Sequence, residues 1–213
     1  MFPPASERVA ELSDELELSV ELSRMQGQTI EPAAVIRVLD DAQVKYVLVG
    51  AHAISALAGD PRATMDVDVI ASDPVKARDA LSKAFPQLTV EEHPVVIRFK
   101  QQGQEVIDII RPTAAPIFNA ALTHTTRVKL GKLDVTVPLA EAALALKFAS
   151  MISLTRASED RHIDAHDFIR LAKHNAKMDR QKLAELGEIV YVGGGNELLK
   201  LVDDAQAGRQ VSI

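Results

Sequence analysis

The stretch YVLVGAHAISALAGDPRATMDVDVIAS, residues 46–72, contains most of the features from which the fold of this chain is predicted. Its first four residues, YVLV, form a short apolar run typical of strands that are covered on both faces. Gly50 follows, where a glycine permits a sharp turn and a close approach to the backbone. The alanine-rich residues 51–58 predict a short helix, which ends at the Gly-Asp-Pro sequence of residues 59–61.

The second half of this stretch places two acidic side chains on a predicted strand. Side chains alternate along residues 65–70, so Asp66 and Asp68 are expected on one face. Neighbouring carboxylates repel each other and aspartate is uncommon in strands, so the pair needs an explanation. A hard divalent cation bound by oxygen ligands would turn this repulsion into attraction. A lone D-x-D sequence also occurs by chance on solvated turns, so the pair is informative only together with its neighbours.

Those neighbours favour a site for a metal and a phosphate. The helix that begins near Gly50 offers unpaired backbone N–H groups and the positive end of its dipole, which suit phosphate. Arg62 and Thr64 add a cation and a hydroxyl just before the two carboxylates. The ordered set of strand, glycine, helix, R-x-T-x-D-x-D and strand therefore predicts a metal–nucleotide site.

The same residues resemble the signature of the DNA polymerase β-type nucleotidyltransferase superfamily. The resemblance rests on Gly50-Ala51, Gly59 and the R-x-T-x-D-x-D sequence of residues 62–68. The latter is particularly similar to the AbiEii-like (abortive infection) branch, which includes toxin–antitoxin nucleotidyltransferases. Many members have Gly-Ser or Gly-Gly where this chain has Gly50-Ala51, so a hydroxyl to the nucleotide phosphates is missing here. Ser55, about one helical turn further on, is the candidate to replace it.

A third acidic residue lies on a later predicted strand. Residues 95–100 and 104–110 predict a hairpin, and the second of these strands contains Asp108 among apolar β-branched residues. A charged side chain in such surroundings either faces solvent at a strand end or has a partner. The resemblance implies the second, because the superfamily places a third metal-binding aspartate on a following strand.

Two helical segments of the C-terminal part complete the resemblance. Lys147 is the single charge in the middle of an apolar helix, where a lysine commonly extends its charged end to the surface. In the AbiEii-like branch a lysine in this context points at the nucleotide phosphates. Asp164 and Asp167, followed by Phe168, look like the D-x-x-D-[LIF] element that follows this lysine. An acidic helix face paired with nearby arginines is the alternative explanation of the two aspartates.

Composition and net charge limit the kinds of site, partner and cellular location that are expected for this chain. The chain has 213 residues, 47% of them hydrophobic, no cysteine and a formal net charge of −6. The acidic charge disfavours a broad nucleic-acid surface, and the missing thiols exclude disulfides and thiolate metal sites. The first residues lack the pattern of a signal peptide, and no apolar run is long enough for a bilayer, so a soluble cytoplasmic protein without a membrane partner is expected.

The predicted fold class is α/β (α+β), a nucleotidyltransferase fold with a small mixed sheet flanked by helices. Residues 1–43 are expected to form N-terminal helices that pack on the core, as a peripheral layer or an oligomer contact. Residues 44–137 would form the catalytic core and residues 138–213 a helical C-terminal part. The glycine triplet at 193–195 is predicted to be a flexible connector, with Asn196 as the N-cap of the last helix.

The resemblance implies transfer of a nucleoside monophosphate from an NTP to an acceptor hydroxyl with two Mg²⁺ (or Mn²⁺) ions. Asp66, Asp68 and Asp108 would be the catalytic and metal-binding residues. The nucleotide would be bound by Gly50, Ala51, Ser55, Arg62, Thr64, Lys147, Asp164 and Asp167.

The acceptor stays open between tRNA, a protein and a small molecule. For tRNA, a local basic patch is required, and its candidates are Arg111, Arg127, Lys129 and Lys132. Two other functions are consistent with the residues. One is a catalytically weak nucleotide-binding partner of a toxin or antitoxin, favoured by Ala51, and the other is a glycosyltransferase that uses D-x-D with a metal.

Overall fold

A five-stranded mixed sheet forms the centre of the structure, a computed structural model that describes residues 5–211. Its strands are β1 (Tyr46–Leu48), β2 (Val67–Ala71), β3 (Thr89–Glu92), β4 (Val96–Gln101) and β5 (Gln104–Ile110). They lie in the order β1-β2-β5-β4-β3, with β2 and β5 parallel and the other neighbours antiparallel. A separate antiparallel hairpin consists of β6 (Thr125–Leu130) and β7 (Leu133–Pro138).

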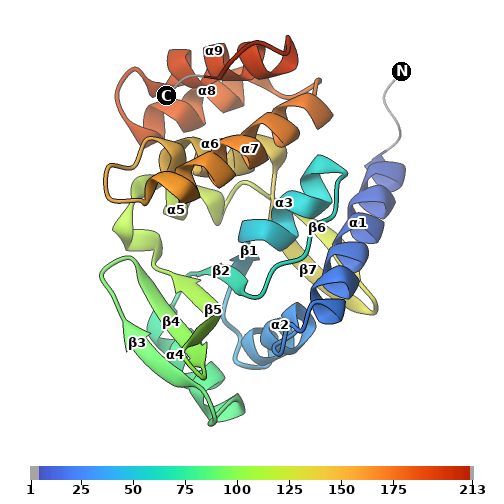
Figure 1. Cartoon of the computed structure of the whole chain (residues 1–213), viewed down its shortest axis with the longest axis vertical. Helices are drawn as coiled ribbons and strands as arrows, with labels where there is room; N and C mark the ends of the chain where they lie inside the picture. Colours follow the sequence, from blue (N-terminus) through green and yellow to red (C-terminus); the bar gives the residue numbers. More distant parts are fainter. Residues whose placement is uncertain (1–4, 212–213) are drawn as a thin grey trace.

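Helices surround the sheet and make up the C-terminal part. In chain order, the helices of residues 5–211 are α1 (Ala5–Met25), α2 (Pro32–Asp41), α3 (Gly50–Ala58), α4 (Pro74–Ala84), the 3₁₀ turn η1 (Pro112–Ala114), α5 (Pro116–Ala121), α6 (Ala140–Met151), α7 (Ser158–His174), α8 (Arg180–Val190) and α9 (Gly194–Gln206). Figure 1 shows α6 to α9 together at one end, the β3–β4 hairpin at the other, and α1 beside the β6–β7 hairpin along one side. The predicted class, a mixed α/β fold with a helical C-terminal part, is therefore confirmed.

The apolar runs of the sequence form the core. Leu16 of α1, Leu48 of β1 and Phe148 of α6 are all completely buried and belong to one hydrophobic cluster. The helix–sheet packing thus includes side chains from each of the three predicted segments. None of the helices in the described part of the chain has the length and apolar character needed to cross a bilayer.

Helix α3 ends where its sequence predicts. Gly59 adopts the left-handed conformation with φ +58°, the usual end of a helix at a glycine. A Cβ atom at this position would also lie within 2.3 to 3.0 Å of the imidazole of His174, so glycine is required for two reasons. The turn brings the loop of residues 60–66 back along α3 toward β2.

Two local predictions are wrong. Strand β2 begins at Val67, so Asp66 precedes the strand instead of sharing a strand face with Asp68. Helix α9 begins at Gly194, so the glycine triplet is no flexible connector and Asn196 lies within the helix. Gly194 and Gly195 are buried against α8, where a Cβ at residue 195 would lie 2.5 Å from a backbone carbonyl. The glycines are needed because they let the two helices pack closely.

The hairpin of β4 and β5 contains an irregularity that aims one of the predicted site residues. Lys100 pairs with Glu105, but Phe99 pairs with Ile107, so Val106 has no partner on β4. A bulge of this kind shifts the register by one residue beyond it. As a result Arg98 faces Asp108 across the two strands.

Candidate functional site

A cleft of about 250 Å³ lies between the sheet and the C-terminal helices. One glycine and six charged residues line it, contributed by α3, β2, β4, β5, α6, α7 and the loop before α7. They are Gly50, Asp68, Arg98, Asp108, Lys147, Arg156 and Asp164. Strand register explains part of this grouping. Asp68 on β2 and Asp108 on β5 are directly opposite each other in the parallel pair, and Arg98 on β4 comes next.

The N-terminus of α3 forms one wall of the cleft. Gly50 begins this helix with φ +64°, and the preceding Val49 makes no side-chain cap to the first N–H groups. The Cα atom of Gly50 is so close to Asp68 that a Cβ would overlap the carboxylate oxygen Oδ2. Any larger residue would have to move Asp68 as well as adopt a strained backbone. The sequence therefore has glycine here for contact with a carboxylate in addition to the turn.

Asp68 is the carboxylate of the cleft without a direct partner. Within residues 5–211 its side chain makes no hydrogen bond or ion pair, although Lys147 and Arg156 are close enough to act on it electrostatically. Burial raises the pKa of Asp68 well above its usual range, and the charges of Asp66 and Asp108 raise it further. Lys147 and Arg156 oppose this shift. A cation placed beside Asp68 would remove the repulsion.

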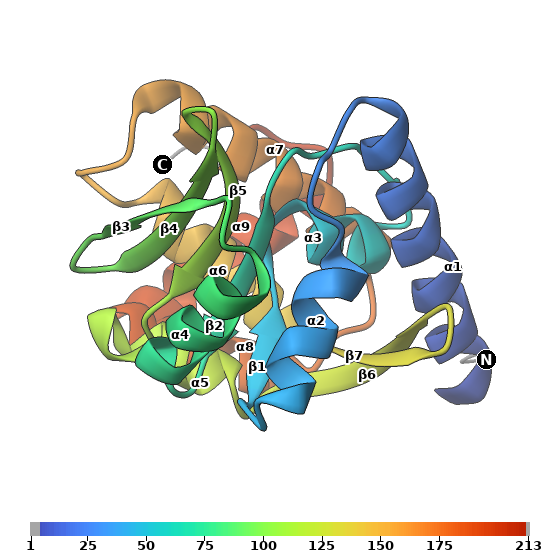
Figure 2. The same ribbon diagram turned by 90° about the horizontal axis from the view of Figure 1, so that it is seen from below.

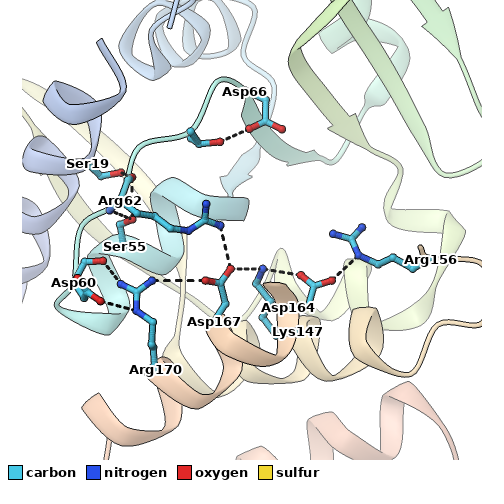
Figure 3. A network of polar contacts seen from close by, with 11 residues as sticks. Ser19, Ser55, Asp60, Arg62, Asp66, Lys147, Arg156, Asp164, Asp167 and Arg170 are labelled. Carbon is cyan, nitrogen blue, oxygen red and sulfur yellow. Dashed lines mark hydrogen bonds and ion pairs between the residues drawn. The ribbon is translucent and has the colours of Figure 1, made fainter. Parts of the chain in front are cut away.

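Asp66 lies before β2 and outside the lining of the cleft. Its Oδ1 accepts a hydrogen bond from the hydroxyl of Thr64, the contact drawn beside Asp66 in Figure 3. The charge of Asp66 still reaches Asp68, because it contributes to the raised pKa of that residue. The two carboxylates of the motif are therefore neighbours, with only Asp68 facing the cleft.

Asp108, in contrast, is fully paired. Arg98 Nε donates to Asp108 Oδ1 at 2.9 Å and Arg98 Nη2 donates to Oδ2 at 2.8 Å. This bidentate contact is the strongest geometry for a guanidinium and a carboxylate. The hydrogen bonds that Arg98 donates to Asp108 raise the pKa of Arg98, so its charge is permanent. Glu105 contacts a third nitrogen of the same guanidinium at 2.6 Å.

Lys147 lies between the two aspartates of α7. Its ammonium donates to Asp164 Oδ1 at 2.9 Å and to Asp167 Oδ2 at 2.8 Å, although it is 17 and 20 residues away from them in sequence. Both aspartates are almost completely buried. Burial works to raise the pKa of Asp167, but Lys147 and Arg62 outweigh it and lower that pKa. Figure 3 shows both contacts of the lysine. The two aspartates therefore hold Lys147, which lines the cleft.

The same two aspartates bind three arginines. Arg156 contacts Asp164 at 2.5 Å, Arg62 donates to Asp167 at 3.2 Å, and Arg170 lies 3.7 Å from Asp167. Arg170 also pairs with Asp60, and neither Arg62 nor Arg170 lines the cleft. Lys147 and Arg156 therefore bring two positive charges to the cleft wall, where they can contact an anion. Arg156 was not predicted as a site residue, because it lies in the loop before α7 and no sequence motif surrounds it.

Apart from Ser150, the rest of the cleft lining is apolar. Ile70 and Ile110 pair across β2 and β5 two residues beyond the aspartates, on the same face of the sheet. Phe118 of α5 and Leu146 of α6 pack against this row and line the cleft with it. The cleft therefore has a charged half, formed by the charged residues described above, and an apolar half that includes these four side chains.

Helix α1 contributes to the site by holding the loop before β2. Ser19 donates to the carbonyl oxygen of Arg62 at 2.9 Å, and Ser23 accepts from the N–H of Thr64 at 2.9 Å. Both serines are completely buried. This helix, predicted from its sequence to be a peripheral layer, thus also fixes the backbone of the R-x-T part of the motif.

Several predicted nucleotide-binding residues lie away from the cleft. Ala51 and Ser55 are buried in α3, and the hydroxyl of Ser55 accepts from the N–H of Arg62 at 3.1 Å. Arg62 and Thr64 are on the loop that α1 holds, and neither lines the cleft. The structure thus brings Gly50, Asp68, Asp108, Lys147 and Asp164 together around one cavity, and the other predicted residues are not part of its lining.

The four basic residues considered for tRNA do not form one patch. Arg111 follows β5 and binds Glu92 of β3 at 2.6 Å. Arg127 and Lys129 are on β6, and Lys132 is in the turn between β6 and β7. Figures 1 and 2 show this hairpin beside α1, on the opposite side of the molecule from β3.

The residues present fit one divalent cation better than two. Asp68, unpaired and next to the charge of Asp66, offers the hard oxygen donors that Mg²⁺ and Mn²⁺ prefer. Asp108 does not extend this set, because Arg98 binds both of its oxygens. Accordingly, nowhere in residues 5–211 do three or more His, Cys, Asp or Glu side chains form a group able to hold a metal.

Comparison with known proteins places the fold. The structure of an antigenic nucleotidyltransferase-like protein from Paracoccidioides brasiliensis matches with a TM-score of 0.50 and 21% identity over 94% of this chain and 95% of that one. The structure of JHP933 from Helicobacter pylori matches with a TM-score of 0.50 and 12% identity over 90% of this chain and 93% of that one. No protein-family model and no curated protein matches the sequence. At these identities the likeness concerns the fold, and that fold is nucleotidyltransferase-like.

Proposed function

We propose that this protein is a nucleotidyltransferase that moves a nucleoside monophosphate from an NTP to an acceptor hydroxyl. The observation that supports this most directly is the contact of Gly50 with Asp68. It places an uncapped helix N-terminus and an unpaired carboxylate side by side in a cleft with Lys147 and Arg156. Helix N-termini and basic side chains bind phosphates, while the carboxylate binds the metal that accompanies them.

Each part of the charged half has a role in this proposal. The N–H groups at the start of α3, Lys147 and Arg156 bind and orient the triphosphate. Asp68 and Asp66 would hold a divalent cation, which when bound supplies positive charge to the phosphate oxygens. Asp108, opposite Asp68 on β5, lines the same cleft and would orient an acceptor hydroxyl there.

Asp164 and Asp167 act through the cations in this proposal. Two buried carboxylates would repel a triphosphate, so direct contact with the nucleotide is unfavourable. Their contacts with Lys147 instead hold the ammonium in place and limit its motion. Arg62 has the same kind of partner in Asp167, and thereby connects the motif loop to α7. We therefore treat the two aspartates as positioning residues of the nucleotide site.

We further propose that the chain belongs to the AbiEii-like branch. The supporting observation is the contact of Lys147 with Asp164 and Asp167, because these are the residues that resemble the lysine and D-x-x-D elements of that branch.

A nucleotide-binding partner of a toxin or antitoxin, with little turnover, is the second candidate function. The Arg98–Asp108 ion pair and the missing hydroxyl at Ala51 favour it. The five-stranded mixed sheet does not resemble the larger α/β domain that a glycosyltransferase requires.

The first prediction concerns metal-dependent binding of an NTP. Because Asp68 is unpaired and repelled by Asp66 and Asp108, an NTP should bind at least about tenfold more tightly with Mg²⁺ than with EDTA. Asp68→Asn should remove most of this difference. Asp203→Asn, on an exposed ion pair with Arg180, should keep it. Isothermal titration with each NTP measures both.

Equal affinity in Mg²⁺ and EDTA would contradict the proposed metal–nucleotide site. Metal-dependent binding of the wild type without release of pyrophosphate, in the presence of cell extract as a source of acceptors, would favour the binding-partner function over the enzyme.

A further inference from the structure

Positive and negative side chains are present in equal number in the lining of the cleft. It contains three carboxylates, Asp68, Asp108 and Asp164, and three cations, Arg98, Lys147 and Arg156. Asp164 is paired with both Lys147 and Arg156, and Asp108 is paired with Arg98. Within the described part of the chain, only Asp68 of this set lacks an ion pair. One added cation, not two, would therefore satisfy all the carboxylates of the cleft.

Strand register and three side-chain contacts fix the position of Arg98 beside Asp108. The β-bulge at Val106 sets the register that aligns the two residues across β4 and β5. The guanidinium then binds both oxygens of Asp108 on one side and Glu105 on the other. Asp108 is nearly buried, with 11% of its side chain exposed, whereas Arg98 keeps 27% exposed at the cleft.

A metal ion at Asp108 would have to displace this guanidinium. The displaced Arg98 would leave a nearly buried bidentate contact, the kind of ion pair whose disruption is most unfavourable. The guanidinium already supplies, at that point, the positive charge that a second metal would bring. Arg98 also lines the cleft together with the unpaired Asp68, whose charge acts on it, and this is where charge on a transferring phosphate would develop.

We infer that Arg98 takes the place of a second metal ion, so that the site binds a single divalent cation, at Asp68 and Asp66. Arg98 is then a positioning and charge-providing residue of the transfer reaction. The inference rests on the proposed function, but it differs from the two-metal arrangement that the sequence resemblance implies.

Counting bound Mn²⁺ ions per chain tests this directly. The titration uses the full chain with an equimolar mixture of the α,β-methylene analogues of ATP, GTP, CTP and UTP, which cannot release pyrophosphate, and electron paramagnetic resonance to count the ions. The wild type should bind one Mn²⁺ per chain. Arg98→Met should bind two, because Asp108 is then free to accept an ion, whereas Arg98→Lys, which keeps a positive charge there, should bind one.

Two further variants keep the test decisive if Arg98→Met folds poorly. Asp108→Asn preserves the shape of the side chain and should bind one Mn²⁺ with the affinity of the wild type, since Asp108 holds no ion. Arg111→Met removes an arginine that is also bound to a glutamate, but outside the cleft, and should bind one as well. Circular dichroism confirms the fold of each variant.

The outcomes separate this inference from the proposed function. Two ions on the wild type, with one of them lost in Asp108→Asn, would overturn the inference and leave the nucleotidyltransferase proposal intact. A single ion on a folded Arg98→Met variant would overturn it too, because Asp108 would then be no cation site. No bound Mn²⁺ on the wild type would overturn both.

Discussion

Gly50 shows at the scale of one residue how the sequence determines the site. Its φ of +64° is a conformation that L-amino acids rarely adopt, and its Cα atom touches the carboxylate of Asp68. The two requirements coincide at one position, so the glycine is needed for the backbone and for the close approach of the carboxylate that we propose to bind the metal. Gly131, in the turn of the β6–β7 hairpin, has a nearly identical φ of +59° but open space where a Cβ would lie.

This pair of glycines allows backbone strain to be separated from contact with the site. Gly131→Ala should lower the free energy of unfolding by about 1 kcal/mol, the strain of a left-handed alanine, and leave Mg·NTP affinity unchanged. Gly50→Ala should destabilise the protein more and weaken Mg·NTP binding by at least about tenfold, because Asp68 must move. Urea unfolding and nucleotide titration of both variants provide the comparison. Equal behaviour of the two variants would show that the contact with Asp68 is unimportant.

At the level of secondary-structure elements, α1 and α3 are joined by a buried polar contact between Ser19 and His52. The Nδ1 atom of His52 on α3 lies 3.1 Å from the hydroxyl of Ser19, and its Nε2 atom lies 3.2 Å from the amide nitrogen of Gln28. Burial lowers the pKa of His52 from 6.5 to about 4; the charge of Asp66 opposes this shift and that of Arg62 adds to it. The imidazole is therefore neutral in the folded protein at neutral pH.

The position of His52 predicts a dependence of stability on pH. Below pH 6.5 the unfolded chain takes up a proton at His52 while the folded protein does not, down to about pH 4. The free energy of unfolding should therefore fall as pH decreases through this range, by roughly 2.5 kcal/mol from this group between about pH 7.5 and 4.5. His52→Gln should show a correspondingly smaller fall in urea unfolding. The control His93→Gln changes an exposed histidine and should follow the wild type. Parallel curves for the wild type and His52→Gln would contradict this interpretation.

The β4–β5 hairpin shows why one element of the site was beyond prediction from sequence. The two strands and their turn follow from alternating apolar residues and Gly103, and the structure confirms them. A regular hairpin counted from the pairs Gln101–Gln104 and Lys100–Glu105 would place Arg98 opposite Ile107. The bulge moves Arg98 to Asp108, and nothing in the local sequence marks it. The ion pair that decides the charge of Asp108 therefore depends on tertiary structure.

At the scale of the molecule, the sequence predicted the architecture better than the contacts. The fold class and the grouping of Gly50, Asp68, Asp108 and Lys147 around one cleft agree with it, because strand and helix periodicity and the resemblance act over whole elements. Asp66 lies outside β2, since strand ends depend on pairing rather than on side-chain pattern. Arg156 was missed, because its contact with Asp164 comes from a loop that only the packed helices α6 and α7 define.

The fate of the individual phosphates of the NTP shows whether the cleft transfers a nucleoside monophosphate. The wild type is incubated with Mg²⁺, cell extract as a source of acceptors, and NTPs labelled at either the α- or the γ-phosphate. The α-label should become bound to an acceptor while the γ-label appears in pyrophosphate, and Asp68→Asn should reduce both by at least about a hundredfold, whereas Asp203→Asn should not. Transfer of the γ-label to an acceptor, or equal transfer of the α-label by the wild type and Asp68→Asn, would contradict the proposed transfer of a nucleoside monophosphate by this cleft.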